Sequence, residues 1–278
     1  MRLERKAVEL RLEILDLICS AGTGHIGGDF SAIDILTYLY YEGMNISPAT
    51  VDDPDRDRFI LSKGHAVEAL YSVLADRGFF DRQALHETYS QLGSPFIGHP
   101  NNQLPGIEMN SGSLGHGLPA AVGIALAGQM DHRRYYTYVL TGDGELAEGS
   151  VWEAFMAAPH FDLDHLVAII DRNGLQISGS TEDVMPQGDL AGKLKLFGWD
   201  VQEIDGNSIP AIRAAVQRAK QTGGRPTAII ANTVKGCGVS FMQNRAGWHH
   251  RVPTAEEAAL ARDELMQKAR ELDERSGE

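Results

Sequence analysis

Four short apolar runs constrain the fold of this chain more than any other feature of its sequence. They have the length of strands and are apolar at nearly every position, at residues 58–62, 136–141, 166–171 and 227–232. Strands of this kind are typical of a sheet that is covered on both faces. Helical patterns alternate with them, at residues 66–77, 117–130, 151–158 and 209–221. This alternation predicts an α/β fold, a doubly wound and mainly parallel sheet with helices on both faces.

Helical patterns also stand near both ends of the sequence. Apolar residues at helical spacing predict an amphipathic helix over residues 3–21. A second helix is predicted over residues 33–41, with Ser31 as its N-cap residue. The charged segment 254–274 opens with a capping-box pattern and is predicted to be a helix. Because no stretch has the composition of a linker, residues 1–278 are expected to form one domain.

Composition excludes several classes of function. Lys and Arg number 25 against 38 Asp and Glu, so the net charge is −13, and no basic block suggests a nucleic-acid partner. No apolar run approaches the roughly 18 residues that span a bilayer. Two cysteines, Cys19 and Cys237, fit a reducing compartment, and the acidic residues near the N-terminus do not fit a targeting peptide. We therefore expect a cytoplasmic protein.

Three long loops alternate with the predicted strands, at residues 92–113, 172–190 and 233–253, and are rich in glycine, proline and asparagine. Long loops in compact domains are usually functional or disordered. Ligands of open α/β sheets bind beyond the carboxyl ends of the strands. The position of these loops therefore favours a functional role.

The sharpest local motif is Gly142-Asp143-Gly144, directly after the strand predicted at 136–141. Flanking glycines let the backbone turn tightly and approach an anion. The following helix offers free N–H groups to a phosphate. Asp143 is then placed to hold a hard cation beside that phosphate. Taken alone, the motif fits an ordinary tight turn equally well.

A second polar motif, Asp171-Arg172-Asn173-Gly174-Leu175, ends the next strand. Neighbouring parallel strands place their carboxyl ends side by side, so Asp143 and Asn173 can offer two oxygens to one ion. A backbone carbonyl and phosphate oxygens would complete the shell. Such all-oxygen ligation suits Mg²⁺ or Ca²⁺ bound to a diphosphate.

With these motifs in place, the sequence resembles the transketolase family. The Gly-Asp-Gly motif followed thirty residues later by Asn173 (173 − 143 = 30) is similar to the thiamine diphosphate motif. Five further segments resemble that family in the same order: AGTGHIGG at 21–28, RFILSKGHA at 58–66, LGSPFIGHP at 92–100, LPGIE at 104–108 and GSLGHG at 112–117. The likeness runs in register from about residue 7 to residue 253.

The resemblance implies roles for individual residues. Asp143, Asn173 and the carbonyl of Leu175 would bind the metal, Mg²⁺ or Ca²⁺. The residues implied to contact the cofactor are His65, Gly112, Leu114, Gly144, Glu148, Asn173 and His249. Among these, Gly144 would touch the diphosphate, and Gly112 and Leu114 would line the pocket for the two rings. Glu148 matches a glutamate at the subunit contact.

Four histidines, His25, His65, His99 and His249, match active-site histidines of the family, and His250 is the alternative to His249. Imidazole, with a reference pKa of about 6.5, can act as acid or base near neutral pH, as cleavage of a ketose requires. We expect His25 and His99 nearest the ketose hydroxyls, and His65 between diphosphate and substrate. The cofactor carries the difficult chemistry, and the protein moves protons and positions the reactants.

Other residues receive a structural interpretation or an open one. His86, His132, His160 and His165 carry no motif and are interpreted as surface or structural groups. His116 stands where many transketolases have Gln, and it either replaces that hydrogen bond or is local variation. Lysines at such positions are more often solvated than catalytic, which is the expectation for Lys63 and Lys235, with a substrate contact as the alternative for Lys235.

A complete transketolase has two further domains, which this sequence does not resemble. The resemblance therefore implies the diphosphate-binding subunit of a split transketolase, which moves a two-carbon ketol unit from a ketose phosphate to an aldose. It implies a partner that carries the pyrimidine-binding domain, most simply in an α2β2 assembly. The alternatives are a deoxyxylulose-phosphate synthase-like enzyme, a 2-oxo acid dehydrogenase E1-like subunit or an inert homologue. The histidine loops argue against the first two, and the intact site residues argue against the third.

Overall fold

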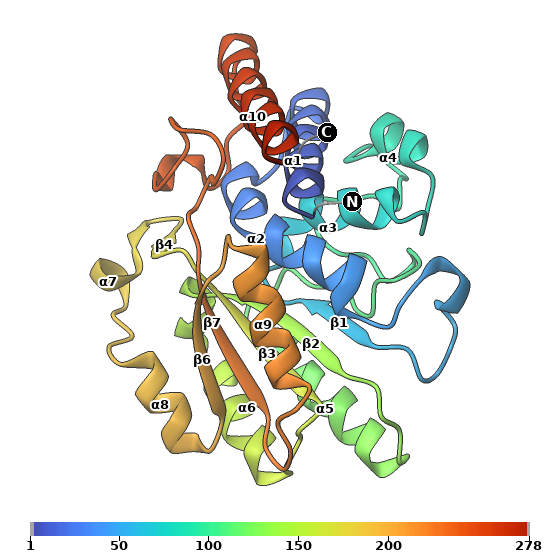
Figure 1. The fold of residues 1–278 in the computed structure, drawn as a ribbon, viewed down its shortest axis with the longest axis vertical. Coiled ribbons are helices and arrows are strands. Elements are labelled where there is room, and N and C mark those ends of the chain that lie inside the picture. Colours follow the sequence, from blue (N-terminus) through green and yellow to red (C-terminus); the bar gives the residue numbers. More distant parts are fainter. Residues whose placement is uncertain (1–2, 277–278) are drawn as a thin grey trace.

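A five-stranded, all-parallel sheet forms the centre of the computed structural model, which describes residues 3–276 (Figure 1). The spatial order of the strands is β1-β2-β3-β7-β6. Their bounds are β1 Arg58–Leu61, β2 Thr137–Gly142, β3 Leu166–Arg172, β6 Asp200–Asp205 and β7 Thr227–Asn232. The four strands expected from the sequence match within one residue at each end. The predicted α/β class is confirmed.

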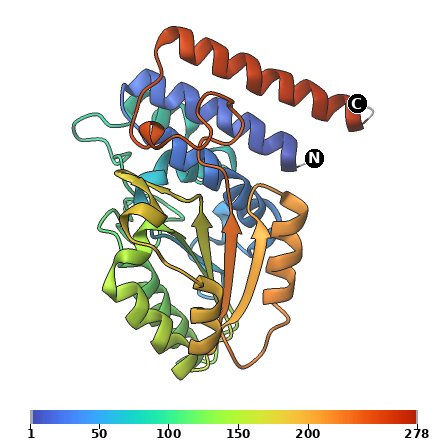
Figure 2. The ribbon, with the colours of Figure 1, turned by 90° about the vertical axis from the view of Figure 1, so that its left-hand side faces the viewer.

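Helices cover both faces of this sheet (Figure 2). Alternate residues of its strands belong to two different hydrophobic cores, one on each face. In β2, Tyr138 and Leu140 join one core while Val139 joins the other. The first core is shared with α1 Leu3–Ala21, α2 Ile26–Tyr38, α3 Val67–Asp76 and α9 Ile209–Ala219. The second is shared with α5 Gly117–Met130, α6 Gly149–His160 and α8 Leu190–Phe197. Because helices cover both faces of the sheet, the central strands are apolar at nearly every position.

Helix α2 begins earlier than expected and corrects the prediction for residues 33–41. Its N-cap is His25, and a π-helical turn, Leu39–Gly43, continues it. Ser31 is therefore not an N-cap but an interior residue. Every residue of α2 is buried, so no polar stripe marks where the helix starts. Positive φ angles at Gly22 (67°) and Gly24 (150°) turn the chain just before it.

Several short elements escaped the sequence prediction. The edge strand β6 has only Gln202 buried, so it carries no apolar run. The long loop 172–190 holds a small antiparallel hairpin and a helical turn. The bounds of the remaining short elements are α4 Arg82–Thr88, β4 Leu175–Gln176, β5 Gly179–Ser180 and α7 Thr181–Val184. Single 3₁₀ turns occur at Pro48–Thr50, Gly64–Ala66, Gly144–Ala147 and Ala246–Trp248.

The last helix, α10 Ala255–Ser276, packs along α1, so the two ends of the described chain lie together (Figures 1 and 2). Its N-terminus has reciprocal hydrogen bonds between Thr254 and Glu257. Ala261 and Leu265 are buried against the first core. Among the helices of residues 3–276, none is both long and apolar enough to cross a bilayer.

Candidate active site

The Gly-Asp-Gly motif and Asn173 meet at the carboxyl edge of the sheet, because β2 and β3 pair in parallel with Gly142 opposite Asp171. The Asp143 carboxylate accepts hydrogen bonds from the amides of Gly144 (2.9 Å) and Gly174 (2.6 Å). These bonds join the two loops and orient the carboxylate. Burial and the nearby charge of Asp171 raise the pKa of Asp143 to about 6, a cost that a neighbouring cation would offset.

A cavity of about 270 Å³ opens beside these two loops. Its walls include seven residues that the sequence predicts for the site: His65, Leu114, Asp143, Gly144, Asn173, Leu175 and His249. The others are Lys63, Gly142, Glu145, Gln176, Ile177 and Lys235. Segments that are far apart in the sequence thus converge on one hollow.

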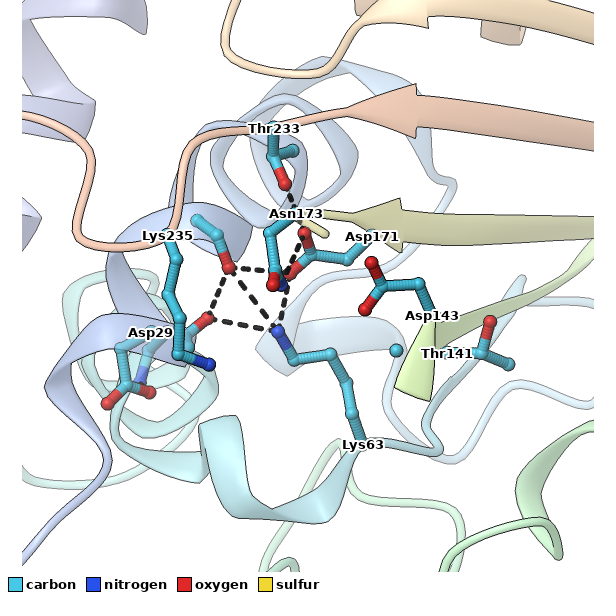
Figure 3. Close-up of polar contacts among 12 residues, drawn as sticks. Asp29, Lys63, Thr141, Asp143, Asp171, Asn173, Thr233 and Lys235 are labelled. Atoms are coloured by element: carbon cyan, nitrogen blue, oxygen red, sulfur yellow. Dashed lines mark hydrogen bonds and ion pairs between the residues drawn. The ribbon is translucent and has the colours of Figure 1, made fainter. Parts of the chain in front are cut away.

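Lys63 lies at the bottom of this cavity, buried rather than solvated, and this corrects the expectation for it. Its ammonium forms an ion pair with Asp171 and donates to the carbonyl of Gly28 (3.0 Å) (Figure 3). Asp171 also accepts from the hydroxyls of Ser31 (2.6 Å) and Thr233. We call Ser31, Lys63, Asp171 and Thr233 the charged floor. Burial alone would raise the pKa of Asp171, but Lys63 lowers it below its ordinary value.

Lys235 is the second lysine of the cavity, and it is also buried, with 1% of its surface exposed. Its ammonium lies 3.0 Å from Nδ1 of His249. Burial and repulsion from Lys63 lower the pKa of Lys235 to about 8. His249 lines the cavity, whereas its neighbour His250 does not line it and is exposed. The solvated interpretation of Lys235 is wrong.

Five imidazole rings lie close to one another, and we call them the histidine cluster: His25, His65, His99, His249 and His250. The ring of His25 lies 5.4 Å from that of His65, 6.2 Å from that of His99 and 4.5 Å from that of His250, between ring centroids. The rings of His65 and His249 are 4.9 Å apart. All four histidines predicted from the sequence thus lie together.

The pKa values of all four predicted histidines are lowered, which favours the neutral form of each ring. Burial and neighbouring positive groups lower the pKa of His25 to about 3 and that of His249 to about 4. Burial and Lys63 lower the pKa of His65 well below its usual value, and burial lowers that of His99. Neutral rings can accept protons, and an incoming anion would raise their pKa values.

Four predicted residues and one open case lie outside the cavity wall. His25 and His99 belong to the histidine cluster instead. Gly112, at φ +133°, passes directly beside His99, where a Cβ atom would lie 2.6 Å from the imidazole carbon Cδ2. Glu148 is exposed at the N-cap of α6, and the open case, His116, is exposed at the N-cap of α5.

Two acidic residues of the site were missed by sequence reasoning. Asp171 belongs to the motif that contains Asn173, yet its partner Lys63 lies 108 positions away. Glu145 follows the Gly-Asp-Gly motif, is buried, and accepts from the amides of Gly115 (2.9 Å) and Gly142 (3.0 Å). It holds the loop of Gly112 and Leu114 against the end of β2. The sequence feature that could have identified Glu145 is its position directly after the Gly-Asp-Gly motif.

The residues present fit a diphosphate with a divalent cation. Two buried ammonium groups face the cavity, and a Cβ atom on Gly144 would lie 2.9 Å from Gln176, so only glycine leaves the space open. Nδ1 of His25 is buried without a hydrogen-bond partner. Within residues 3–276, no three His, Cys, Asp or Glu side chains could hold a metal by themselves. A cation beside Asp143 and Asn173 would therefore need oxygens from a ligand as well.

Comparison with known proteins gives the family. Residues 3–272 match the family described as "Transketolase, thiamine diphosphate binding domain". The chain is 45% identical to one subunit of the apulose-4-phosphate transketolase of Phocaeicola vulgatus, covering 98% of this chain and 96% of that protein. It is 42% identical to a 6-deoxy-6-sulfo-D-fructose transketolase subunit of Clostridium sp., covering 93% and 95%.

Solved structures agree with these relatives. A transketolase from Pichia stipitis superposes with a TM-score of 0.89 at 34% identity, over 95% of this chain and 41% of that one. The transketolase of Campylobacter jejuni superposes with a TM-score of 0.90 at 28% identity, over 96% and 43%. The chain thus spans about two-fifths of these solved transketolases. It belongs to the transketolase family, as its thiamine-diphosphate-binding domain.

Proposed function

We propose that this chain is the diphosphate-binding subunit of a two-subunit transketolase. The enzyme would transfer a two-carbon ketol unit from a ketose phosphate to an aldose, with thiamine diphosphate and a divalent cation. The observation that carries this proposal is the cavity where Asp143, Asn173, Lys63, Lys235 and His249 converge. This one cavity combines oxygens for a cation, ammonium groups for a diphosphate and imidazoles for proton transfer to and from a sugar.

The residues would divide the work by position. Asp143, Asn173 and the carbonyl of Leu175 would hold Mg²⁺ or Ca²⁺. Gly144, Lys235, His65 and His249 would bind the diphosphate, which would compensate the positive groups that now lower each other's pKa values. The residues left for the cofactor rings are Gly112 and Leu114, and Glu148 is left for the subunit contact. When bound, thiamine diphosphate supplies the electron sink for breaking and making a carbon–carbon bond beside a carbonyl.

His25 and His99 would move the protons of the sugar hydroxyls. Their lowered pKa values leave both rings neutral, so either can accept a proton as the ketose is cleaved and return it to the product. A sugar phosphate near the cluster would raise these pKa values toward neutrality, where acid–base catalysis is most effective.

A partner subunit with the pyrimidine-binding domain, most simply in an α2β2 assembly, completes the proposal. Relatives that match over nearly their whole length are themselves named as single subunits of a transketolase, which supports such a partner. We take residues 1–278 as one domain that includes α10. Both cysteines, Cys19 and Cys237, are free thiols, which supports a reducing cytoplasm.

A coupled spectrophotometric assay tests the proposal. This chain, the candidate partner and their mixture are each assayed with thiamine diphosphate, Mg²⁺ and a panel of ketose donors. The panel includes apulose 4-phosphate and 6-deoxy-6-sulfo-D-fructose, named for the relatives, and xylulose 5-phosphate and sedoheptulose 7-phosphate. We expect two-carbon transfer in the mixture alone. Full activity of this chain by itself, or none in the mixture with any donor, would contradict the proposal.

A further inference from the structure

A buried pair of carboxyls lies outside the cavity but between the helices that support the histidine cluster. Asp29 belongs to the first turn of α2 and Glu68 to the first turn of α3, and neither has any exposed surface. Asp29 comes four residues after His25, and Glu68 comes three residues after His65. In Figure 3, Asp29 lies to the left, away from the carboxylates of Asp143 and Asp171. The pair is thus separate from the metal end of the site.

The hydrogen bonds of this pair are incomplete if both carboxyls are ionised. Oδ1 of Asp29 accepts from the amide of Ala69 (2.9 Å), and Oε1 of Glu68 accepts from the hydroxyl of Tyr89 (2.6 Å). Oδ2 of Asp29 and Oε2 of Glu68 are buried and have no donor. A proton on one carboxyl would let it donate to the other, and the side chains are placed for that bond.

The surroundings of the pair favour such a proton. The groups that face it are Tyr89, Tyr71, the amide of His25 and the more distant ammonium of Lys63. Lys63 is itself bonded to Asp171 and Gly28, so it does not neutralise the pair. Burial and repulsion by Glu68 raise the pKa of Asp29 well above its usual value. Burial raises the pKa of Glu68 to about 7, against the opposing effect of the Tyr89 hydrogen bond.

The same network reaches the third histidine-bearing loop. Tyr89 follows α4 and begins the segment that leads to His99, and the hydroxyl of Tyr71 donates to the carbonyl of His99 (3.0 Å). On the other side, Gly24 lies against the pair, since a Cβ atom there would be 2.6 Å from Oε1 of Glu68. One buried cluster therefore contacts the supports of His25, His65 and His99.

We propose that Asp29 and Glu68 share one proton, and that this carboxyl pair fixes the relative positions of the loops that carry His25, His65 and His99. Both are positioning residues, because neither lines the cavity. Only the catalytic consequence rests on the proposed function. The shared proton is a property of the chain alone.

The proposal has a definite sign with respect to pH. Because the pair holds its proton in the folded chain at pH values where a solvated carboxyl has lost it, the folded chain binds more protons than the unfolded chain. Stability therefore falls as pH rises from about 5 to about 7. Above that range Glu68 is ionised, while the shared proton stays between the two carboxyls because the pKa of Asp29 is raised well above its usual value. When this last proton is lost at higher pH, the two like charges repel, and the loops of the three histidines lose their common support.

Infrared difference spectroscopy of the full chain, with the variants Glu68→Gln and Asp29→Asn, tests the shared proton. Each variant replaces a carboxyl by an amide of the same shape that donates permanently. We expect the carbonyl band of one protonated carboxyl at pH 8, where Asp143, with a pKa of about 6, is ionised, and we expect either substitution alone to remove it. A proton that belongs to one residue only would be lost in only one variant, and a band that survives both would overturn the proposal.

Thermal unfolding and NMR test the positioning role. Between pH 5 and 7, the Tm of the wild-type chain should fall relative to Glu68→Gln by roughly 2–4 °C per pH unit. The exposed Glu87→Gln on α4 is the matched control and should keep the wild-type slope. Above pH 7, the ring signals of His25, His65 and His99 should shift together in the wild type and stay constant in Glu68→Gln. If Tm depends on pH equally in the wild type and Glu68→Gln, or if the histidine signals shift equally in both, the carboxyl pair does not position the loops.

Two further measurements separate this inference from the proposed function. Tyr89→Phe keeps both carboxyls but removes the hydroxyl that donates to Glu68. The infrared band should therefore persist to a higher pH than in the wild type. A band that disappears at the same pH or at a lower one would contradict the network. In the two-subunit holoenzyme, kcat/KM should decline on the alkaline side for the wild type and stay flatter for Glu68→Gln, and identical profiles would contradict the catalytic consequence. If no two-carbon transfer occurs at all, the proposed function fails while the infrared and unfolding results still decide the shared proton.

Discussion

The charged floor and the histidine cluster both contribute residues to one cavity, yet their charges are balanced in opposite ways. In the floor, Asp171 accepts from Lys63, Ser31 and Thr233, so each buried charge already has its partners. In the cluster, Nδ1 of His25 has no partner, and burial together with the neighbouring imidazoles and Lys235 lowers the pKa of His25. The charges of the floor are satisfied by residues of the chain itself, whereas the cluster contains a buried imidazole nitrogen without a partner. Structural and functional burial of charge are thus separated within one site.

Breaking the floor should have the largest effect. Asp171→Ala leaves the ammonium of Lys63 buried without its counter-charge, and loss of one partner of such a pair costs about 3–5 kcal/mol of unfolding free energy. Urea denaturation of the full chain measures it. Replacing both residues together, as Lys63→Met with Asp171→Leu, should recover much of the loss. If the free energy of unfolding of Asp171→Ala lies within about 1 kcal/mol of the wild-type value, the charged floor has no special structural role and the contrast with the histidine cluster is wrong.

Breaking the cluster should instead affect turnover. His99→Ala removes a proton carrier, and general acid–base catalysis contributes about 10²–10⁴-fold, so kcat of the holoenzyme should fall by that order. The affinity for thiamine diphosphate, measured by calorimetry, should change little. His132→Ala, an exposed histidine remote from the cluster, is the control. Parallel losses of kcat and affinity would assign His99 a structural role.

Asp143 belongs to neither region, and its substitution should separate binding from stability. Asp143→Ala removes a ligand of the proposed cation, so affinity for thiamine diphosphate with Mg²⁺ should fall by at least about 100-fold. The melting temperature of the chain without ligand should stay near the wild-type value, because a buried like charge beside Asp171 is removed. Asp55→Ala, an exposed carboxylate, provides the comparison. Unchanged calorimetric affinity would place the cation elsewhere.

The smallest effect concerns acid sensitivity of the cluster. The pKa of His249 is lowered to about 4, so below the ordinary value of 6.5 the unfolded chain binds more protons than the folded chain. Stability contributed by this neutral ring is therefore lost as pH falls. From pH 6.5 to 5, His249→Asn should lose about 1–2 °C less in Tm than the wild type. Inorganic diphosphate should reduce this difference in Tm loss between the two proteins. If the two proteins lose the same Tm without diphosphate, the ring of His249 is solvated.

Sequence reasoning located the strands well because continuous burial leaves an unbroken apolar run, as at 166–171 and 227–232. It missed β6, whose edge position leaves four of its six residues polar. It also misplaced the start of α2, since a helix buried on every side has no amphipathic pattern. Local sequence patterns therefore predict elements whose apolar residues recur at regular spacing. They fail for elements whose burial depends on segments that are distant in the sequence.

The candidate site divides in the same way. The spacing of Asp143 and Asn173 follows from two adjacent parallel strands, so it was visible in the sequence, and the histidine loops were visible through their resemblance to a family. The burial of Lys63 and Lys235 was not, because it depends on Asp171 and on a loop far away in the chain. The carboxyl pair of Asp29 and Glu68 was invisible for the same reason: 39 residues separate two side chains that share one environment (68 − 29 = 39).

The packing of α10 on α1 sets an order of events during synthesis. Helix α1 is synthesised long before Ala261 and Leu265 of α10, which belong to the core that the two helices share. At 5–20 residues per second, roughly 10–50 s pass between the two. During that time one side of α1 has no native cover, so the nascent chain offers an apolar stripe that a chaperone can bind. Ion pairs of Arg5 with Asp273 and of Arg262 with Asp16 then join an early and a late segment of the chain.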